Sequence, residues 1–297
     1  MSRLPRIAGG VAAAAVGVIG YGSLIERHLY TVRRVDVPVL APGARPIQVL
    51  HISDLHLTAR QRRKQDWVRS LAALRPDIVV NSGDTLAGRD ALPAVLHALG
   101  PLLEFPGAFV PGNNDYYEPR LKNPVRYFFP DRSRRHGVTR LPWPELAQAL
   151  AGRGWLDLTH ARGAVEVAGQ RVALAGTDDP HLRRARYARI AGRADPAAVV
   201  RIGVIHSPEP PLLDRFAADG YDLVLAGHTH GGQVRVPFGP ALVTNCGIDI
   251  HRARWLHPWD GRMYFHICAG GGSSPYTPIR VACRPEAALL TLVPRPS

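Results

Sequence analysis

The sequence of 297 residues is poor in cysteine and in lysine. Its three cysteines, Cys246, Cys268 and Cys283, include no Cys-x-x-Cys pair, which argues against a structural zinc cluster, and their odd number argues against a disulfide framework. Lys64 and Lys122 are the only lysines among 37 basic residues. No P-loop or kinase motif is present to supply phosphate chemistry of those kinds. No basic stretch is interleaved with aromatic residues, so we expect no specific nucleic-acid partner.

Acidic residues are outnumbered, and the chain carries a formal net charge of +13. Such a field favours anionic substrates and anionic membrane surfaces. The densest basic run, Arg60–Lys64 (RQRRK), indicates a solvated helix start that could attract an anionic substrate. Hydrophobic residues make up 46% of the chain, which is typical of a globular protein with a sizeable core.

Charge is absent from Ile7–Ile25, between arginines on either side. Nineteen residues are just long enough to cross a bilayer as a helix, although five glycines and five alanines make the run only weakly hydrophobic. We expect residues 1–34 to form a membrane anchor and juxtamembrane segment, which predicts a single-pass protein of the cell membrane. A cleaved signal peptide and a buried helix are the alternatives. The flanking arginines leave the side of the membrane undetermined.

Residues 35–297 alternate short β-type runs with helix-type segments, which predicts one α/β domain. Residues 31–46 suggest a Pro-rich connector with strand-like flanks. Ile47–Ile52 and Ile78–Asn81 are typical of buried strands, and the turn at 168–170 predicts a hairpin. We expect two packed mixed β-sheets flanked by helices. Tyr116–Glu145 lacks a clear period and is interpreted as a lid or binding loop, or as a packed surface excursion.

Side chains able to bind metals follow five of the predicted strands. In the stretch HISDLHL, Asp54 and His56 are two residues apart and would face the same side of an extended segment. The other sequences at strand ends are GD with Asp84, GNND with Asn113, Asn114 and Asp115, a lone His206, and GHTH with His228 and His230. The carboxyl ends of strands are where ligands bind in open α/β sheets, and the glycines before three of these residues permit tight turns. Any one could be a buried ion pair or a core histidine, but five in register indicate a metal site.

The order D-x-H, GD, GN-x-D, H, GHTH resembles the calcineurin-like metallophosphoesterase superfamily. The anchor and the VTN and GGG stretches resemble its bacterial, membrane-attached branch. The resemblance implies a metallophosphoesterase-type α/β sandwich with two divalent metal ions, Mn²⁺, Fe or Zn²⁺. It implies hydrolysis of phosphomonoester, phosphodiester or pyrophosphate bonds by a hydroxide that bridges the metals. It places Asp54, His56, Asp84 and His230 on the first metal and Asp84, Asn113, His206 and His228 on the second, with Asp84 bridging.

One position departs from the family pattern, which has histidine where this chain has Asn114. That histidine acts near the leaving group, and an amide cannot give up a proton at neutral pH. Tyr116, His181 or His251 could substitute, or the leaving group needs little help. If the loop is shifted by one residue, Asn114 rather than Asn113 could be the metal ligand.

The sequence indicates only a broad class of substrate. We expect a phosphorylated small molecule or lipid. Alternative interpretations are a lipid-linked pyrophosphatase, similar to the UDP-diacylglucosamine hydrolases of the family, and a non-catalytic metal-binding scaffold.

Overall fold

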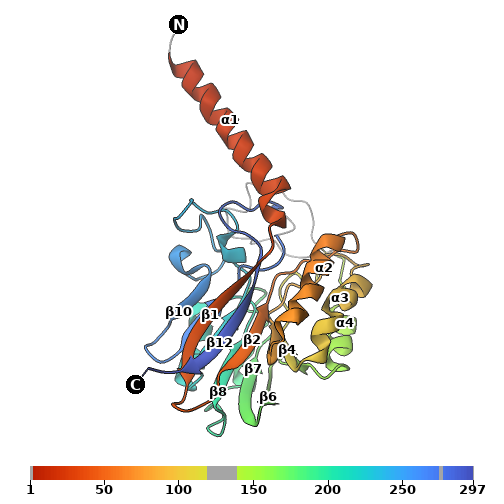
Figure 1. Ribbon diagram of the computed structural model, residues 1–297, viewed down its shortest axis with the longest axis vertical. Coiled ribbons are helices and arrows are strands. Elements are labelled where there is room, and N and C mark those ends of the chain that lie inside the picture. The colour runs from red at the N-terminus through yellow and green to blue at the C-terminus, as the bar shows by residue number, and fades with distance from the viewer. Residues whose placement is uncertain (1–2, 119–138, 274–276, 297) are drawn as a thin grey trace.

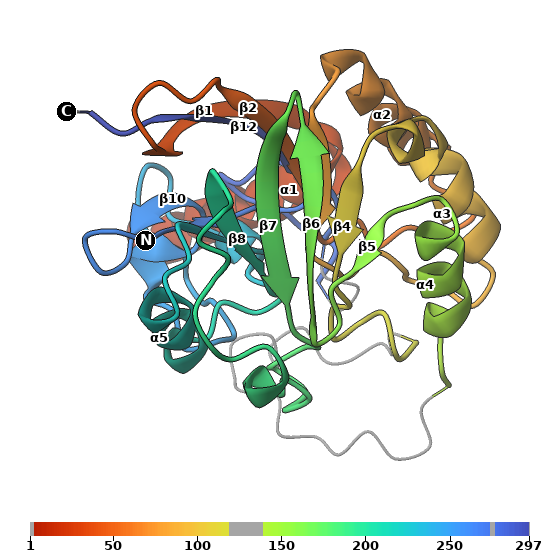
Figure 2. The ribbon, with the colours of Figure 1, turned by 90° about the horizontal axis from the view of Figure 1, so that it is seen from below.

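The computed structural model describes residues 3–118, 139–273 and 277–296, with side chains from Ala13 onward. Two β-sheets pack face to face, and helices cover their outer faces (Figures 1 and 2). The predicted architecture of two packed mixed sheets flanked by helices is therefore confirmed. The predicted hairpin is also present, with Ala168 and Gly169 both at positive φ in its turn.

The elements follow one another in short segments. The first sheet has the order β1 (Thr31–Leu40), β12 (Glu286–Pro294), β2 (Ile47–Ile52), β3 (Ile78–Asn81), β4 (Gly107–Phe109), β5 (Leu156–Asp157). The second has the order β10 (Trp255–Pro258), β11 (Tyr264–Ile267), β9 (Leu223–Ala226), β8 (Val200–Val204), β7 (Gln170–Gly176), β6 (Ala161–Val167). The α-helices are α1 (Arg3–Leu24), α2 (Arg62–Ser70), α3 (Leu92–Leu99), α4 (Trp143–Ala151) and α5 (Pro210–Ala218), and the 3-10 turns used below are η1 (Glu26–His28), η6 (His230–Gly232) and η7 (Ile250–Arg252).

Both sheets are mixed, and their central strands run parallel. In the first sheet β2, β3, β4 and β5 are parallel, while β12 is antiparallel to β2. In the second sheet β7, β8, β9 and β11 are parallel. Because Ile52 pairs with Asn81 at the last residues of β2 and β3, the loops that follow these two strands emerge side by side.

The core has an inner layer between the sheets and an outer layer under the helices. Val49 and Val80 contribute to the inner cluster with residues of the second sheet, whereas Leu50 and Val79 pack in the cluster that contains residues of α2, α3 and α4. The alternation follows from the two-residue period of a strand. The central strands are buried on both faces and hold the strand ends in fixed positions.

The proposed connector at residues 31–46 is mostly a strand. Thr31–Leu40 forms β1, which lies at the edge of the first sheet and pairs in parallel with β12. An edge strand tolerates Pro38 because the missing N–H can face away from the partner, and the register shifts between Pro38 and Leu40. The boundary predicted between residues 34 and 35 thus falls inside a strand of the folded unit.

The N-terminal apolar run forms helix α1, which projects from the rest of the molecule (Figure 1). Val16, Ile19 and Leu24 are exposed, so the buried-helix alternative is wrong. Within the part of the chain that the structure describes, no helix has the length and apolar character needed to cross a membrane. The predicted transmembrane helix is therefore not found.

The long segment Tyr116–Glu145 is described only at its two ends. Residues 119–138 lie outside the described residues, so the lid interpretation of that stretch is not addressed. Tyr117 and Arg140 form an isolated antiparallel bridge where the segment leaves and rejoins the domain. Trp143, which the segment was taken to include, begins α4 and is buried in the outer core.

Candidate metal centre

The predicted metal-binding side chains meet where the carboxyl ends of strands from both sheets converge. β2, β3 and β4 deliver their following loops from the first sheet, and β8 and β9 deliver theirs from the second. The site is therefore built between the sheets and not at the edge of one alone.

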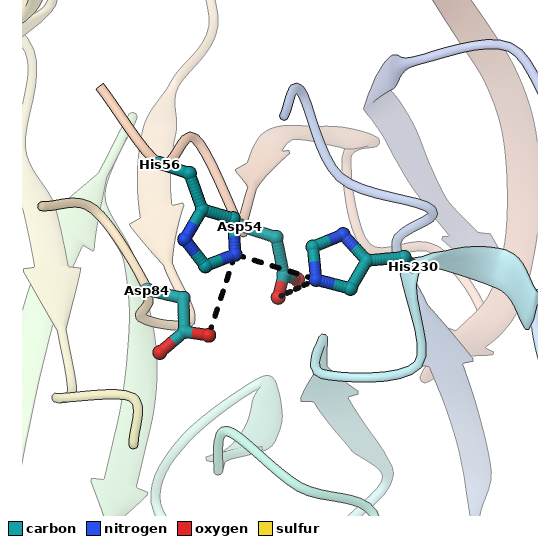
Figure 3. A group of neighbouring side chains, drawn as sticks. All are labelled: Asp54, His56, Asp84 and His230. Carbon is teal, nitrogen blue, oxygen red and sulfur yellow. Dashed lines mark hydrogen bonds and ion pairs between the residues drawn. The ribbon is translucent and has the colours of Figure 1, made fainter. Parts of the chain in front are cut away.

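Four buried side chains form a close group at this point (Figure 3). The Nε2 atoms of His56 and His230 lie 3.3 Å apart, and their rings are stacked. His56 Nε2 is 3.5 Å from Asp84 Oδ2, and His230 Nε2 is 3.5 Å from Asp54 Oδ1. One ligand atom from each of the four residues lies within 4.8 Å of those from the others. This is the set that the resemblance placed on one metal.

The backbone at these residues is not extended. Asp54, His56, Asp84, His228 and His230 all have positive φ, between 42° and 69°. The prediction that Asp54 and His56 face one way because they belong to an extended segment is therefore wrong. Tertiary contacts turn these side chains inward, and β2 already ends at Ile52.

Glycines at the strand ends serve two different purposes. Gly83 has φ 100°, so a tight turn requires it, as predicted. Gly112 and Gly227 do not have positive φ; they are needed for space. A Cβ on Gly112 would collide with Asp84, and one on Gly227 would collide with Ser53 and Asp54. These two glycines let neighbouring loops approach the metal-binding carboxylates.

The second predicted set adjoins the first through Asp84. His206 Nε2 lies 3.4 Å from Asp84 Oδ2, and the other ring nitrogen of His206 lies 2.8 Å from the Ser82 carbonyl. That hydrogen bond fixes the ring so that Nε2 faces the carboxylate. His228 Nδ1 lies 3.1 Å from Asn113 Oδ1, and the His206 and His228 rings are 5.2 Å apart.

Asn114 contacts Asp84 directly. Its backbone N–H donates to Oδ1 at 2.7 Å, and its side-chain amide donates to Oδ2 at 2.6 Å. Asn113 instead lies beside His228. The two neighbouring asparagines therefore have different environments, one on the shared carboxylate and one on an imidazole.

The electrostatics of the group suit a cation. Burial lowers the pKa of His56 to about 4 and holds the pKa values of His228 and His230 well below the usual range. Although burial opposes ionisation of Asp84, the neighbouring His206 holds the pKa of Asp84 well below that of an ordinary carboxyl, and Asp84 in turn raises the pKa of His206 above its usual value. Burial raises the pKa of Asp54 to about 6. Neutral imidazoles and ionised carboxylates are the forms that bind metals.

The residues present fit a divalent metal. Asp54 Oδ1 and His206 Nε2, which face the group, are buried without a hydrogen-bond partner among the described residues. A buried polar atom without a partner costs on the order of 1–3 kcal/mol, so such a concentration indicates a missing partner. Carboxylate, amide and imidazole donors together suit Mn²⁺, Fe or Zn²⁺ better than Ca²⁺.

Asp115 has a role that the sequence reasoning did not assign. Its buried carboxylate accepts hydrogen bonds from the backbone N–H groups of Gly112, Asp84, Thr85 and Leu86, at 2.7–2.9 Å. It joins the loop after β3 to the loop after β4. The motif GNND contained this acid, but four donors from two loops cannot be seen in a linear pattern.

Arg280 was also missed. It is fully buried, and its guanidinium donates to the carbonyls of Ala269, Gly270, Gly272 and Cys283. Arg280 thus binds the loop of residues 269–272. This loop packs on the residues that follow β2, because Gly271 N–H donates to the Ser53 carbonyl and Gly272 N–H to the Asp54 carbonyl. Arg280 is therefore a positioning residue for Asp54.

The three candidate proton donors lie in different surroundings. The Tyr116 hydroxyl donates to Asp178 at 2.8 Å, and burial raises its pKa above the usual value. His251 is exposed in η7. The His181 ring lies against the His228 ring, with centroids 4.6 Å apart. Among these three, His181 is the one in ring contact with a predicted metal ligand.

Residues 47–232 match the family model described as calcineurin-like phosphoesterase, which covers more than half of the chain. The chain belongs to this family. It is therefore a metal-dependent phosphoester hydrolase with a cluster of aspartates and histidines that could hold a metal. The matched residues include every proposed metal ligand from Asp54 to His230.

Relatives of this phosphoesterase align with most of its length. It is 26% identical over 290 residues to the uncharacterized protein YpbG of Bacillus subtilis (strain 168). The alignment covers 95% of this chain and 94% of the relative. It is 24% identical over 279 residues to the phosphodiesterase YaeI of Escherichia coli (strain K12), with 92% of each chain covered. It is 25% identical to the transmembrane protein with metallophosphoesterase domain of Danio rerio, over 87% of this chain and 56% of that protein.

Proposed function

We propose that the protein is a phosphodiesterase or pyrophosphatase that uses two divalent cations held between its two sheets. The observation that carries the proposal is the buried group Asp54, His56, Asp84 and His230, in which two imidazole nitrogens face each other at 3.3 Å. A cation among these two histidines and two carboxylates would bind the ligand atoms that lie within 4.8 Å of one another. A relative over almost the whole chain is itself named a phosphodiesterase.

Asp84 is the residue that would be shared by both cations. Its Oδ2 lies 3.5 Å from His56 Nε2 and 3.4 Å from His206 Nε2. Asn113, on His228, would complete the second set, and Asn114 would hold the Asp84 carboxylate in place through two hydrogen bonds. When bound, such cations supply Lewis acidity toward phosphate oxygens and an activated water.

Proton donation to the leaving group is proposed for His181. It lies on His228 at the edge of the second set, whereas the Tyr116 hydroxyl is directed to Asp178. General acid catalysis is typically worth about 10²–10⁴-fold. Replacement of His181 by asparagine should therefore lower kcat on substrates with poor leaving groups and leave those with good ones nearly unchanged.

The proposal is tested by hydrolysis of bis(4-nitrophenyl) phosphate and of a pyrophosphate diester by the purified protein with Mn²⁺ or Zn²⁺. Activity should vanish after chelation and return with the metal, and Asp54→Asn should abolish it. Metal binding without hydrolysis of either substrate would instead favour the non-catalytic scaffold. A preference for a lipid-linked pyrophosphate over the soluble diester would favour the UDP-diacylglucosamine hydrolase-like alternative.

A further inference from the structure

A strongly basic cavity of about 650 Å³ adjoins the metal centre. Its basic lining residues are Arg27, His28, Arg60, Arg62, Arg63 and Lys64. No aspartate or glutamate is among the described residues that line it. His56, one of the four residues of the metal group, also lines the cavity, so the two are continuous.

The walls of this cavity are anchored to the fold. Arg60, Arg62 and Arg63 are exposed where α2 begins, as predicted for a solvated helix start, whereas Lys64 is buried and its Nζ donates to the Leu55 carbonyl at 2.7 Å. Burial lowers the pKa of Lys64 to about 7. Glu26, in the same 3-10 turn as Arg27, accepts hydrogen bonds from the backbone of Ala282 and Cys283. Tyr30 lines the cavity and stacks on Trp67, with ring centroids 4.8 Å apart.

The first turn of helix α2 lies at the cavity and carries positive charge, although a helix N-terminus favours negative charge. α2 begins at Arg62 and carries Arg62, Arg63 and Lys64 in its first turn, with no acidic residue there. The N-terminus of a helix favours negative charge, so cations at this place are unfavourable. An anion in the cavity would relieve both the helix dipole and the repulsion among the cations.

Three arginines of the cavity differ from many others in the molecule, because they have no carboxylate partner among the described residues. Arg60, Arg62 and Arg63 are exposed, and none forms an ion pair with a described residue. In contrast, Arg33, Arg171, Arg184, Arg201 and Arg295 each pair with a carboxylate. The cavity therefore concentrates positive charge that the described protein does not neutralise.

We propose that this cavity binds a second phosphate group of the substrate, one that is not hydrolysed, while the scissile phosphate lies at the metal group. The substrate class is then a molecule with two phosphate groups, either a soluble compound or a phospholipid headgroup. Arginine provides paired N–H donors that match phosphate oxygens. The assignment of the cavity to the substrate rests on the proposed hydrolase function, whereas the binding of phosphate by the cavity does not.

The test uses full-length protein stripped of metal, so that binding at the metal centre does not contribute. Isothermal titration calorimetry with inorganic pyrophosphate compares the wild type with Arg60→Gln/Arg63→Gln. The matched control is Arg153→Gln, an exposed arginine after α4 that does not line the cavity. A flotation assay with phosphatidylglycerol vesicles, against phosphatidylcholine vesicles, provides the lipid arm.

The double variant should weaken binding by about tenfold or more in at least one arm, since it removes two charged donors to phosphate oxygens. Arg153→Gln should bind like the wild type. The arm that responds identifies the source of the phosphate. Equal affinity of the wild type and the double variant in both arms, or an equal loss in Arg153→Gln, would overturn the proposal. Binding in protein that hydrolyses neither test substrate would retain the cavity while rejecting the proposed function.

Discussion

At the residue scale, the metal centre holds its side chains on a strained backbone. Five proposed ligands have φ between 42° and 69°, a region that residues with a side chain seldom occupy. Such conformations cost on the order of 1–3 kcal/mol each and persist only where the surrounding structure imposes them. Here the imposing contacts are visible, such as the hydrogen bond from the His228 backbone to Asp54. The strain places donor atoms from separate loops within reach of a common ion.

Asp84 is the residue whose loss should affect both proposed ions. Asp84→Asn removes the negative charge that faces both His56 and His206. We expect bound metal to fall from about two ions per chain to less than one, as measured by elemental analysis of the dialysed protein. The control is Asp222→Asn, at the opposite end of β9, where the carboxylate pairs with Arg201. Full metal content in the Asp84 variant would refute the shared-ligand assignment.

Asn114 should make the enzyme sensitive to its leaving group. It donates to Asp84 and cannot supply a proton, so departing groups that are stable as anions should be favoured. A phosphate, with a second pKa of about 6, leaves readily, whereas an unactivated alkoxide does not. With His181 as the proposed donor in place of the usual histidine, we expect kcat/KM to fall from nitrophenyl to alkyl diesters, and to fall more steeply in His181→Asn.

The matched variant for that series is Asn114→His. It should raise kcat/KM on alkyl esters more than on nitrophenyl esters, with unchanged metal content as the control for its fit. A dependence that is flat in the wild type and steep in His181→Asn would show that His181 replaces the usual histidine completely. A steep dependence that His181→Asn leaves unaltered would instead remove His181 from that role.

At the scale of elements, Asp115 joins two loops that carry metal-binding residues. Its carboxylate accepts four backbone N–H groups, and an asparagine can satisfy them with one oxygen only. Asp115→Asn should lower the free energy of unfolding by about 3 kcal/mol, as measured by urea denaturation. Asp157→Asn, whose amide oxygen can still accept the single exposed hydrogen bond from Thr159 N–H, should have a much smaller effect. Similar midpoints for the two variants would contradict this role.

The contacts of the N-terminal elements predict how many N-terminal residues can be deleted without loss of thermal stability. Residues 31–34 belong to β1 and pair with residues 286–289 of β12, and Arg33 pairs with Glu286. We expect deletion of residues 1–20 to preserve thermal stability and hydrolysis, and deletion of residues 1–34 to lower the melting temperature. Differential scanning fluorimetry of the two truncated proteins makes the comparison. Equal melting temperatures would show that the edge of β1 contributes nothing to the fold.

The elements around the site were predictable to different degrees. Runs such as Ile47–Ile52 and Ile78–Asn81 are apolar on both faces, so local composition was enough to identify them as strands. β1 was not recognised because Pro38 and the prolines around it suggest a connector, and its pairing with β12 lies more than 250 residues away. Gly112 was correctly singled out, but its reason, close approach to Asp84, depends on tertiary structure.

At the scale of the whole molecule, the site exists because two sheets end at the same place. Asp54 and His228, joined by a hydrogen bond, are 174 residues apart in sequence and belong to different sheets. The order of motifs was sufficient to name the ligands, since it matched a family pattern. The basic cavity was not predictable in the same way, because Arg27 and Arg63 are distant in sequence and line one cavity only in the folded chain.

A metal ion at this place would link the two sheets, and its removal should therefore lower the stability of the whole protein. Mn²⁺ or Zn²⁺ at about a hundredfold excess over Kd should stabilise the folded state by about 2.7 kcal/mol, or roughly 5 °C in melting temperature, relative to protein with chelator. His230→Asn should lose this rise because its ring comes from the second sheet and faces Asp54 of the first. His257→Asn, on β10 away from the group, should keep it. A melting temperature that is the same with metal and with chelator would mean that the group binds no ion across the sheets.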